Sequence, residues 1–349
     1  MLLKQNHLIG LDIGSRSIKV ADIVQGSNGL ALKHFGMEPL PADTISDGVI
    51  EEPGVVVAAI RRLIADLKIK EKKVAISVSG YSVIIKKIVL AKMSEEELSQ
   101  SIQFEAEQYI PFDVQDVNID FHILGDSDQN PNQMNVMLVA AKKGVVDVYL
   151  DILTRSGLIP AVIDVDAFAL ENAFETNYLF EDGETMLVDI GANQMNISVL
   201  KEGVSAVTRD VAMGGEQITR EIASEFDLSF EEAETAKLGT PNDKVSPDAL
   251  EHIRTRCVSQ WCNEVRRAID FFYSTYSDSE IKRIFLSGGA ARTEGLIELL
   301  AVETSVDVEL FNPFNELSIE VKHPDPDLQS VAPQAAICVG LALRRMDDK

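Results

Sequence analysis

The sequence has few cysteines, little positive charge and no long apolar run. Three cysteines in 349 residues cannot form a disulfide framework, and Cys257 and Cys262 are spaced for one helix face rather than for a metal site. The chain carries 32 lysines and arginines against 56 aspartates and glutamates, a formal charge of −24. So acidic a surface repels nucleic-acid phosphates, which disfavours DNA binding.

No stretch approaches the roughly 18 uninterrupted apolar residues that a membrane-spanning helix requires. The apolar start of the chain, residues 1–14, is broken by Lys4, Gln5, Asn6 and His7 and lacks the core of a signal peptide. We therefore expect a cytoplasmic protein that reaches a membrane only through partner proteins.

Hydrophobic residues make up 46% of the chain and charged residues 25%, as in globular proteins, and the length predicts about two domains. The apolar periodicity predicts a mixed α/β fold. Beyond the repeat described next, we expect strands at 73–78, 83–91, 117–124, 134–141, 159–165 and 283–286, helices at 55–67, 94–109, 145–156, 215–237, 247–276 and 335–345, and a loop at 324–332.

The most informative feature is an internal repeat. Residues 8–14, 18–24 and 30–37 alternate between apolar and polar side chains, which predicts three antiparallel strands joined by short turns. Residues 184–200 and 204–212 repeat this order, and the first strand of each copy ends in Asp-x-Gly. Because chance rarely repeats a motif together with its flanking strands, we interpret the pattern as an internal duplication.

Each copy carries a hairpin turn that directs backbone N–H groups inward, an arrangement that cradles phosphate oxygens. A single such turn is more often an ordinary hairpin, but two copies facing each other would clamp a polyphosphate. Asp12 and Asp189 behind the turns predict a magnesium ion, held mostly through water. The predicted phosphate-binding residues are Gly14, Ser15, Arg16, Ser17 and Lys19 in the first copy and Gly191, Ala192, Asn193 and Asn196 in the second.

A third glycine motif lies near the end of the chain, in the segment IFLSGGAARTEGL. We expect a strand that enters a turn at Gly288, Gly289 and Ala290, where the backbone can approach a ligand, followed by a helix whose N-terminus favours negative charge. An antiparallel strand rather than a helix follows Gly14, which argues against a dinucleotide-binding Rossmann fingerprint.

Together the three motifs resemble the phosphate 1, phosphate 2 and adenosine motifs of the superfamily of actin, Hsp70 and sugar kinases. The segment GGEQITREIASEFDLSFEEAETAKLG, which begins at Gly214 and Gly215, resembles the nucleotide side of the cell-division protein FtsA and its relatives. In those proteins a glutamate and a lysine approach the ribose. The matching positions are Glu234 and Lys237.

The segments SEEELSQSIQFEAEQYIPF, VMLVAAKK and GLIPAVIDVDAFAL are most similar to the PilM family of type IV pilus assembly proteins, and this resemblance covers nearly the whole chain. It implies an actin-like, ribonuclease H-like two-lobed α/β fold with ATP or ADP and magnesium in the cleft between the lobes. The implied parts are a 1A-like core at 1–82 and 157–182, an inserted FtsA-type, 1C-like subdomain at 83–156, a 2A-like core at 183–214 and 277–349, and a 2B-like helical subdomain at 215–276.

The resemblance also implies the function. Proteins of this family are cytoplasmic scaffolds, peripheral at the inner membrane, that bind the N-terminal cytoplasmic segment of PilN and connect the assembly complex to the cytoplasmic motor ATPase. Two alternatives remain: an FtsA-like cell-division filament protein, although no amphipathic helix follows a linker here, and a small-molecule or sugar kinase, although no sugar-binding motif is found. The cytoplasmic module of a type II secretion scaffold is a weaker alternative.

Two features predict that ATP hydrolysis is slow or absent. The second hairpin has Ala192 and Asn193 where relatives usually carry Gly and either Gly or Thr, which removes backbone freedom and a hydroxyl. No clear base stands out: Asp166 is the candidate for activating water, Asp164 is second, and the alternative is that both acids only cap the helix that follows.

The partner peptide is expected in a groove between residues 91–112 and the first lobe. An apolar groove with an acidic rim would suit an extended segment with a few apolar anchors and basic flanks. The alternative is that Ile102 and Tyr109 pack under the subdomain's own sheet.

Overall fold

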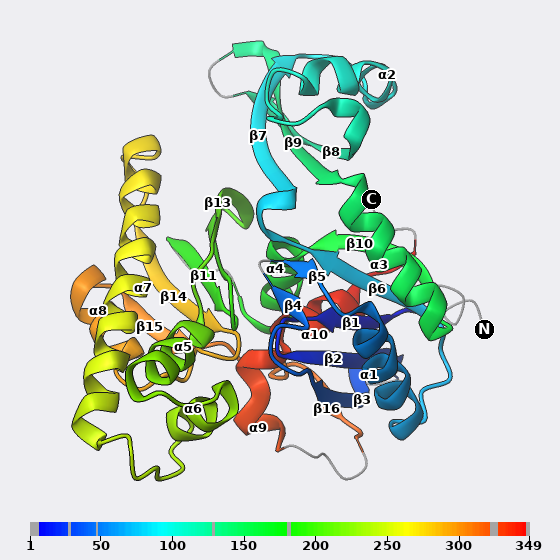
Figure 1. Ribbon diagram of the computed structural model, residues 1–349. Coiled ribbons are helices and arrows are strands. Elements are labelled where there is room, and N and C mark those ends of the chain that lie inside the picture. The colour runs from blue at the N-terminus through cyan, green and yellow to red at the C-terminus, as the bar shows by residue number, and fades with distance from the viewer. Residues whose placement is uncertain are drawn as a thin grey trace.

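The computed structural model describes residues 7–26, 29–46, 48–127, 130–179, 183–321 and 327–346. Two lobes lie side by side, and a smaller part stands above the first of them (Figure 1). None of the helices in this described part combines the length and the apolar character that a membrane span needs.

Lobe 1 is built on a six-stranded sheet in the order β10-β6-β1-β2-β3-β16. The strands β1, β2 and β3 form the predicted antiparallel start, and β1, β6 and β10 run parallel. The bounds are β1 Ile9–Ile13, β2 Ser17–Gly26, β3 Gly29–Pro39, β6 Lys73–Val78, β10 Ile159–Val165 and β16 Ser318–Ile319, and a small hairpin is formed by β4 Ile45–Ser46 and β5 Val49–Ile50.

Helices cover both faces of this sheet. On one face, α1 (Pro53–Asp66) and α3 (Lys143–Ser156) share a core with Ile9 and Leu11 of β1. On the other face lie α4 (Asp166–Asn177) and α10 (Ala336–Leu343). A Cβ on Gly10 would lie 2.1 Å from the carbonyl oxygen of Cys338, so the absence of a side chain there lets α10 lie directly on β1.

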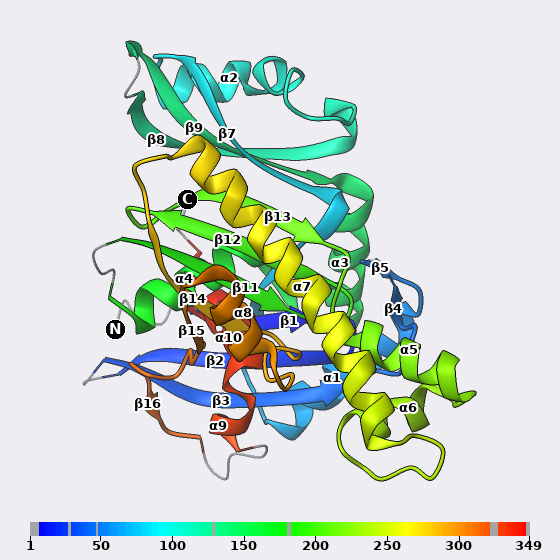
Figure 2. The same ribbon diagram turned by 90° about the vertical axis from the view of Figure 1, so that its left-hand side faces the viewer.

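Lobe 2 repeats the strand order of lobe 1. Its sheet runs β13-β12-β11-β14-β15, which matches β3-β2-β1-β6-β10, so the structure supports the internal repeat. The long helix α7 (Pro247–Thr275) crosses one face of this sheet, with α8 (Leu296–Thr304) beside it (Figure 2). The strands are β11 Glu184–Ile190, β12 Met195–Lys201, β13 Val204–Val211, β14 Ile281–Ser287 and β15 Asp307–Leu310.

The two lobes share one apolar core. Phe174 of α4 packs against Phe285 of lobe 2, and one buried cluster joins both to Phe35 of lobe 1 and to residues that precede α10. Those residues form α9 (Leu328–Val331) and a 3-10 helix (Ala332–Ala335), so the loop predicted at 324–332 is wrong from Leu328 onward; positions 324–326 lie outside the described residues.

The inserted part has its own small core. A three-stranded sheet in the order β7-β9-β8 packs against α2, and the buried residues of this core belong to the inserted part alone. By contrast, Tyr149, Ile152 and Leu153 of α3 belong to the core of lobe 1, so we place α3 there rather than in the inserted subdomain. The elements are β7 Val83–Ala91, α2 Glu95–Ala106, β8 Val117–Ser127 and β9 Asn130–Lys142, with 3-10 helices at Gly80–Ser82 and Val114–Asp116.

The helical region predicted at 215–237 is two helices, α5 (Gly215–Phe226) and α6 (Phe230–Lys237). Asp227 ends α5 in the left-handed conformation, and Ser229 begins α6 with a capping box to Glu232. With the first half of α7, these helices form one wall beside the cleft.

Candidate nucleotide-binding site

A cavity of about 710 Å³ lies between the lobes, at the carboxyl ends of β1 and β11. It brings together nearly all the predicted site residues, from both hairpins, the third glycine motif and the helical wall. They are Asp12, Gly14, Ser15, Arg16, Ser17, Lys19, Asp166, Asp189, Gly191, Ala192, Asn193, Asn196, Gly215, Glu234, Lys237, Gly288, Gly289 and Ala290.

Gly214 is the exception. It lines a neighbouring hollow instead, and a Cβ there would lie 2.4 Å from the carbonyl oxygen of Ala192. Its place in the fold is explained by this close approach of α5 to the second hairpin.

The two hairpins have the same backbone. The N–H of Gly14 donates to the carbonyl of Ser17 at 3.1 Å, and the N–H of Gly191 donates to the carbonyl of Gln194 at 2.8 Å. In the strand ladders Asp12 pairs with Lys19, and Asp189 pairs with Asn196. We call residues 12–19 the first hairpin and residues 189–196 the second hairpin.

Asp12 in the first hairpin has a cation beside it. The ammonium of Lys19 donates to its Oδ2 at 2.8 Å, and both side chains are largely buried. Burial alone would lower the pKa of Lys19, but the charge and hydrogen bond of Asp12 outweigh it and raise that pKa. Lys19 therefore stays charged at the floor of the cavity.

Asp189 in the second hairpin has no lysine across the ladder. Ser287 of β14 donates its hydroxyl to Asp189 Oδ1 at 2.8 Å. Desolvation in the cleft raises the pKa of Asp189 to about 6; Ser287 opposes this and the charge of Asp12 adds to it. The positive charge near Asp189 therefore does not offset its burial. A magnesium ion held through water would supply the missing charge.

Asp166 is the first residue of α4 and lines the cavity. Desolvation and then the charge of Asp12 raise its pKa to about 7, against hydrogen bonds from Ser77 and Ser79. The second candidate, Asp164, does not line the cavity; its Oδ1 accepts the N–H of Val165, and Oδ2 lies 3.5 Å from Arg344 Nε. The N-cap of α4 is Val165 with no side-chain hydrogen bond, so the alternative that both acids cap this helix is wrong.

Glu234 and Lys237 lie on the helical wall of the cavity. Lys237 Nζ is 2.7 Å from Glu234 and donates to the hydroxyl of Thr219 at 2.9 Å. Thr219 in turn donates to Glu234. This closed triangle fixes a carboxylate and an ammonium at the cavity wall, where hydroxyl groups of a sugar could bond to them.

The third glycine motif also lines the cavity. Gly288 has a φ of +90°, and a Cβ there would lie 2.3 Å from the carbonyl oxygen of Ile190, so only glycine fits. A Cβ on Gly289 would have no close neighbour, which leaves its backbone open to the cavity. The helix that follows, α8, begins only at Leu296, so the expectation of a helix N-terminus directly after the glycines is wrong.

Several lining residues escaped the sequence reasoning. Ser77 lies near the carboxyl end of the parallel strand β6 and Ser79 follows it, and the rule that parallel strands present their carboxyl ends at one sheet edge could have found them. Gln194 of the second hairpin and Arg292, Thr293 and Glu294 of the third glycine motif lie in segments that the sequence singles out. Tyr149, Arg254 and Gln334 come from distant segments and carry no local signal.

The cavity fits a magnesium nucleotide. Asp12 and Asp189 both line it, and these two carboxylates would hold the ion mostly through water. Arg16 Nη1 and Asn196 Oδ1 are buried without a hydrogen-bond partner among the described residues. A phosphate oxygen would satisfy the first atom and a metal-bound water the second.

Two sets of contacts join the lobes across this cavity. In the Asp210 contact, Asp210 accepts the N–H of Gly80 at 2.9 Å and the side-chain amide of Asn196 at 2.6 Å. Gly80 stands at the root of β7, so this contact ties the second hairpin to the inserted part.

The second set is the Phe230 contact. The guanidinium carbon of Arg16 lies 4.7 Å from the centre of the Phe230 ring, and that of Arg220 lies 5.7 Å from it. Arg220 also pairs with Asp43 of lobe 1 at 2.8 Å. Lobe 1 and the helical wall of lobe 2 are therefore joined beside the first hairpin.

Comparison with known proteins agrees with this geometry. The chain is similar to the solved PilM-PilN type IV pilus biogenesis complex, with a TM-score of 0.83 and 27% identity over 97% of this chain and 98% of the other. It is 23% identical to the cell division protein FtsA of Enterococcus hirae over 89% of this chain and 79% of that protein. MreB5 of Spiroplasma citri bound to AMPPNP is similar in fold, with a TM-score of 0.52 and 11% identity over 97% of this chain and 95% of the other.

These likenesses confirm the actin-like two-lobed α/β fold. The model of the family described as type IV pilus assembly protein PilM matches residues 10–346, nearly the whole chain. The chain therefore belongs to the PilM family of type IV pilus assembly proteins.

Proposed function

We propose that this chain binds ATP or ADP with Mg²⁺ between its lobes and acts as a scaffold of the type IV pilus assembly complex. The observation that carries the nucleotide proposal is the pair of matching hairpins around one cavity, each with a carboxylate behind it. Bound magnesium would neutralise phosphate and carboxylate charge together. Backbone N–H groups, Lys19 and Arg16 would hold the phosphate oxygens.

We infer that hydrolysis is slow or absent. Asp166 is the carboxylate best placed to accept a proton from water, and its raised pKa makes it a usable base only near or above neutral pH. The second hairpin contributes Ala192 and Asn193 and no hydroxyl to orient that water. The nucleotide would therefore act mainly by setting the angle between the lobes.

We further propose that the partner is the N-terminal cytoplasmic segment of PilN, which would hold the protein at the inner membrane and connect it to the motor ATPase. The similar solved structure is a PilM-PilN complex, which supports this partner. The proposed groove lies between residues 91–112 and lobe 1.

Several residues beside the proposed groove have contacts within the inserted part. Ile102 is buried in the inserted part's own core and Tyr109 packs against that core, as the alternative for these two residues predicted. Lys86 lies over the ring of Tyr109 at 5.4 Å, and Lys142 over that of Phe112 at 4.3 Å. The rim is therefore not uniformly acidic, and acidic residues of a bound segment would find partners on it.

Titration calorimetry with Mg·ADP and with the PilN segment tests both parts. We expect wild-type protein to bind each ligand, and Asp164→Asn, which alters an acid away from the cavity, to bind Mg·ADP as the wild type does. Cell-division proteins and sugars should give no signal. Phosphorylation of a sugar would favour the kinase alternative, and capture of division proteins would favour the FtsA-like one.

A further inference from the structure

The loop between α1 and β6, together with the first residue of β6, carries an unusual set of lysines for so acidic a chain. Lys68, Lys70, Lys72 and Lys73 fall within six residues, and the first three are exposed. None of the four has an ion-pair partner among the described residues, whereas Lys19, Lys92 and Lys201 elsewhere are each paired with a carboxylate. The positive charge of this loop is therefore available to an external anion.

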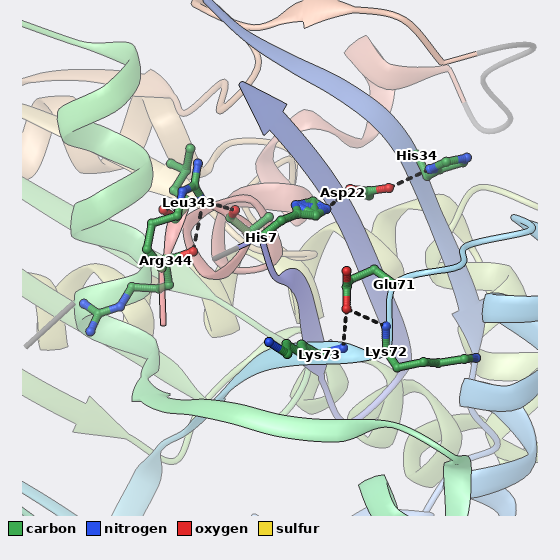
Figure 3. Close-up of polar contacts among 10 residues, drawn as sticks. His7, Asp22, His34, Glu71, Lys72, Lys73, Leu343 and Arg344 are labelled. Carbon is green, nitrogen blue, oxygen red and sulfur yellow. Dashed lines mark hydrogen bonds and ion pairs between the residues drawn. The ribbon is translucent and has the colours of Figure 1, made fainter. Parts of the chain in front are cut away.

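Two acids near this loop, Glu71 and Asp22, already have hydrogen bonds or ion pairs within the protein (Figure 3). Glu71 accepts the backbone N–H groups of Lys72 and Lys73 at 2.9 Å each. Burial would raise the pKa of Glu71, but these bonds and nearby positive charge outweigh it and lower that pKa. Asp22 is held by His7 and His34 at 2.8 Å each. Of the acids described within residues 66–73, Asp66 at the end of α1 is exposed and Glu71 is partly buried.

The lysines lie on the side of lobe 1 away from the cavity. Because β1, β6 and β10 run parallel, their first residues share one edge of the sheet and their last residues face the nucleotide site. Lys73 begins β6 and Ile159 begins β10 at this edge. In Figure 1 the connection from α1 to β6 lies on the right side of the molecule.

Exposed apolar side chains accompany the charge. The N–H of Ile159 donates to the carbonyl of Lys72 at 2.8 Å, and the Ile159 side chain is 55% exposed. Lys73 Nζ lies 3.0 Å from the sulfur of Met346, a side chain that is 44% exposed. We call Lys68, Lys70, Lys72, Lys73, Ile159 and Met346 the basic edge.

We propose that the basic edge docks on a bilayer surface that contains anionic lipids. Lysine ammonium groups pair with lipid phosphates, and isolated apolar side chains beside them enter the headgroup boundary, a combination typical of peripheral membrane contacts. A nucleic-acid backbone would use the lysines but not Ile159 and Met346. Since the chain as a whole carries −24, its other faces are repelled by the same surface, so the contact sets one orientation with the cavity pointing away.

Co-sedimentation with vesicles tests this proposal without nucleotide or partner peptide. The probes are vesicles of pure phosphatidylcholine and vesicles in which part of it is replaced by phosphatidylglycerol. We expect binding to the anionic vesicles only, falling as salt rises. Because each lysine near a charged surface is worth about fivefold in binding, replacing Lys68, Lys70 and Lys72 by serine should weaken it about 100-fold.

A matched triple variant, Lys87→Ser, Lys143→Ser and Lys244→Ser, makes the same charge change on other faces and should bind as the wild type does. Ile159→Ser should weaken vesicle binding severalfold. Because this loss comes from apolar contact, it should remain at high salt. Unchanged thermal melting and Mg·ADP binding in the first triple variant would show that fold and cavity are intact.

Three results would overturn the proposal. They are equal binding of the two triple variants, equal binding to neutral and anionic vesicles, and no binding to either. Displacement from vesicles by duplex DNA at equal phosphate concentration would assign the edge to nucleic acid instead. None of these outcomes bears on the nucleotide cavity, so failure here and failure of the proposed function are distinguishable.

Discussion

The two hairpins share a backbone and differ in chemistry. Both close with an N–H bond from glycine to the residue three positions on, and both follow an aspartate on a central strand. Across the ladder, however, Asp12 faces Lys19 whereas Asp189 faces Asn196. One carboxylate is neutralised by a lysine, and the other is left to a serine hydroxyl and to whatever cation enters the cleft.

The difference shows how a duplicated element takes on a second task. Asn196 donates its amide to Asp210 and not to Asp189. Asp210 also accepts the N–H of Gly80 at the root of the inserted part. The second hairpin therefore has no lysine at this position and instead connects the cavity to the root of β7.

The largest effect should come from removing the lysine of the first hairpin. Lys19→Met leaves Asp12 buried without a cation and should lower the free energy of unfolding by about 3 kcal/mol, as breaking a buried pair does. Asn196→Ala, at the matching position, should cost about 1.5 kcal/mol, because one hydrogen bond to the Asp210 carboxylate is lost but no buried charge loses its cation. Urea unfolding of both variants without magnesium measures this; equal losses would mean that the two hairpins do not differ as described.

The next largest effect concerns Asp166 and pH. An unfolded aspartate releases its proton near pH 4, and Asp166 near 7, so between these values the native state holds the extra proton and stability falls as pH rises. Asp166→Asn should remove most of this fall and be more stable than wild type at pH 8 by about 2 kcal/mol. Asp164→Asn is the control; a wild-type stability that rises from pH 5 to 8 in parallel with Asp166→Asn would contradict the assignment.

A smaller effect should follow from breaking the connection at Asp210. Asp210→Ala leaves the amide of Asn196 and the N–H of Gly80 without their acceptor, at a cost of about 1–2 kcal/mol. Amide hydrogen exchange should speed up at residues 79–82 and stay unchanged in α1. Exchange that rises evenly over the whole chain would indicate general destabilisation instead of a local connection.

The smallest effect should come from the Phe230 contact. Phe230→Leu keeps an apolar side chain but removes the ring face from Arg16 and Arg220. The free energy of closing the lobes should therefore become less favourable by about 0.5–1 kcal/mol. Mg·ADP affinity should then fall by a factor of about 2–5. Phe271→Leu changes an exposed aromatic on α7 and should leave the affinity unchanged. An equal drop in this control would contradict a specific contribution of the Phe230 contact.

The sequence predicted the repeated parts of this molecule best. The Asp-x-Gly hairpins, their flanking strands and most cavity residues follow from local alternation and from the repeat of one motif. The local sequence does not tell whether α3 belongs to lobe 1 or to the inserted part, because the burial of Tyr149 depends on packing against α1. The Phe230 contact joins residues more than 200 positions apart, and no periodicity connects Arg16 with Phe230.

The central claim is that both hairpins serve one magnesium nucleotide. Calorimetric titration of Mg·ADP into wild type, Asp12→Asn, Asp189→Asn and the control Asp22→Asn, each repeated without magnesium, tests it most directly. We expect Asp12→Asn and Asp189→Asn each to lose most of the gain in affinity that magnesium gives, and Asp22→Asn to keep it. An unchanged magnesium dependence in both hairpin variants would contradict the account.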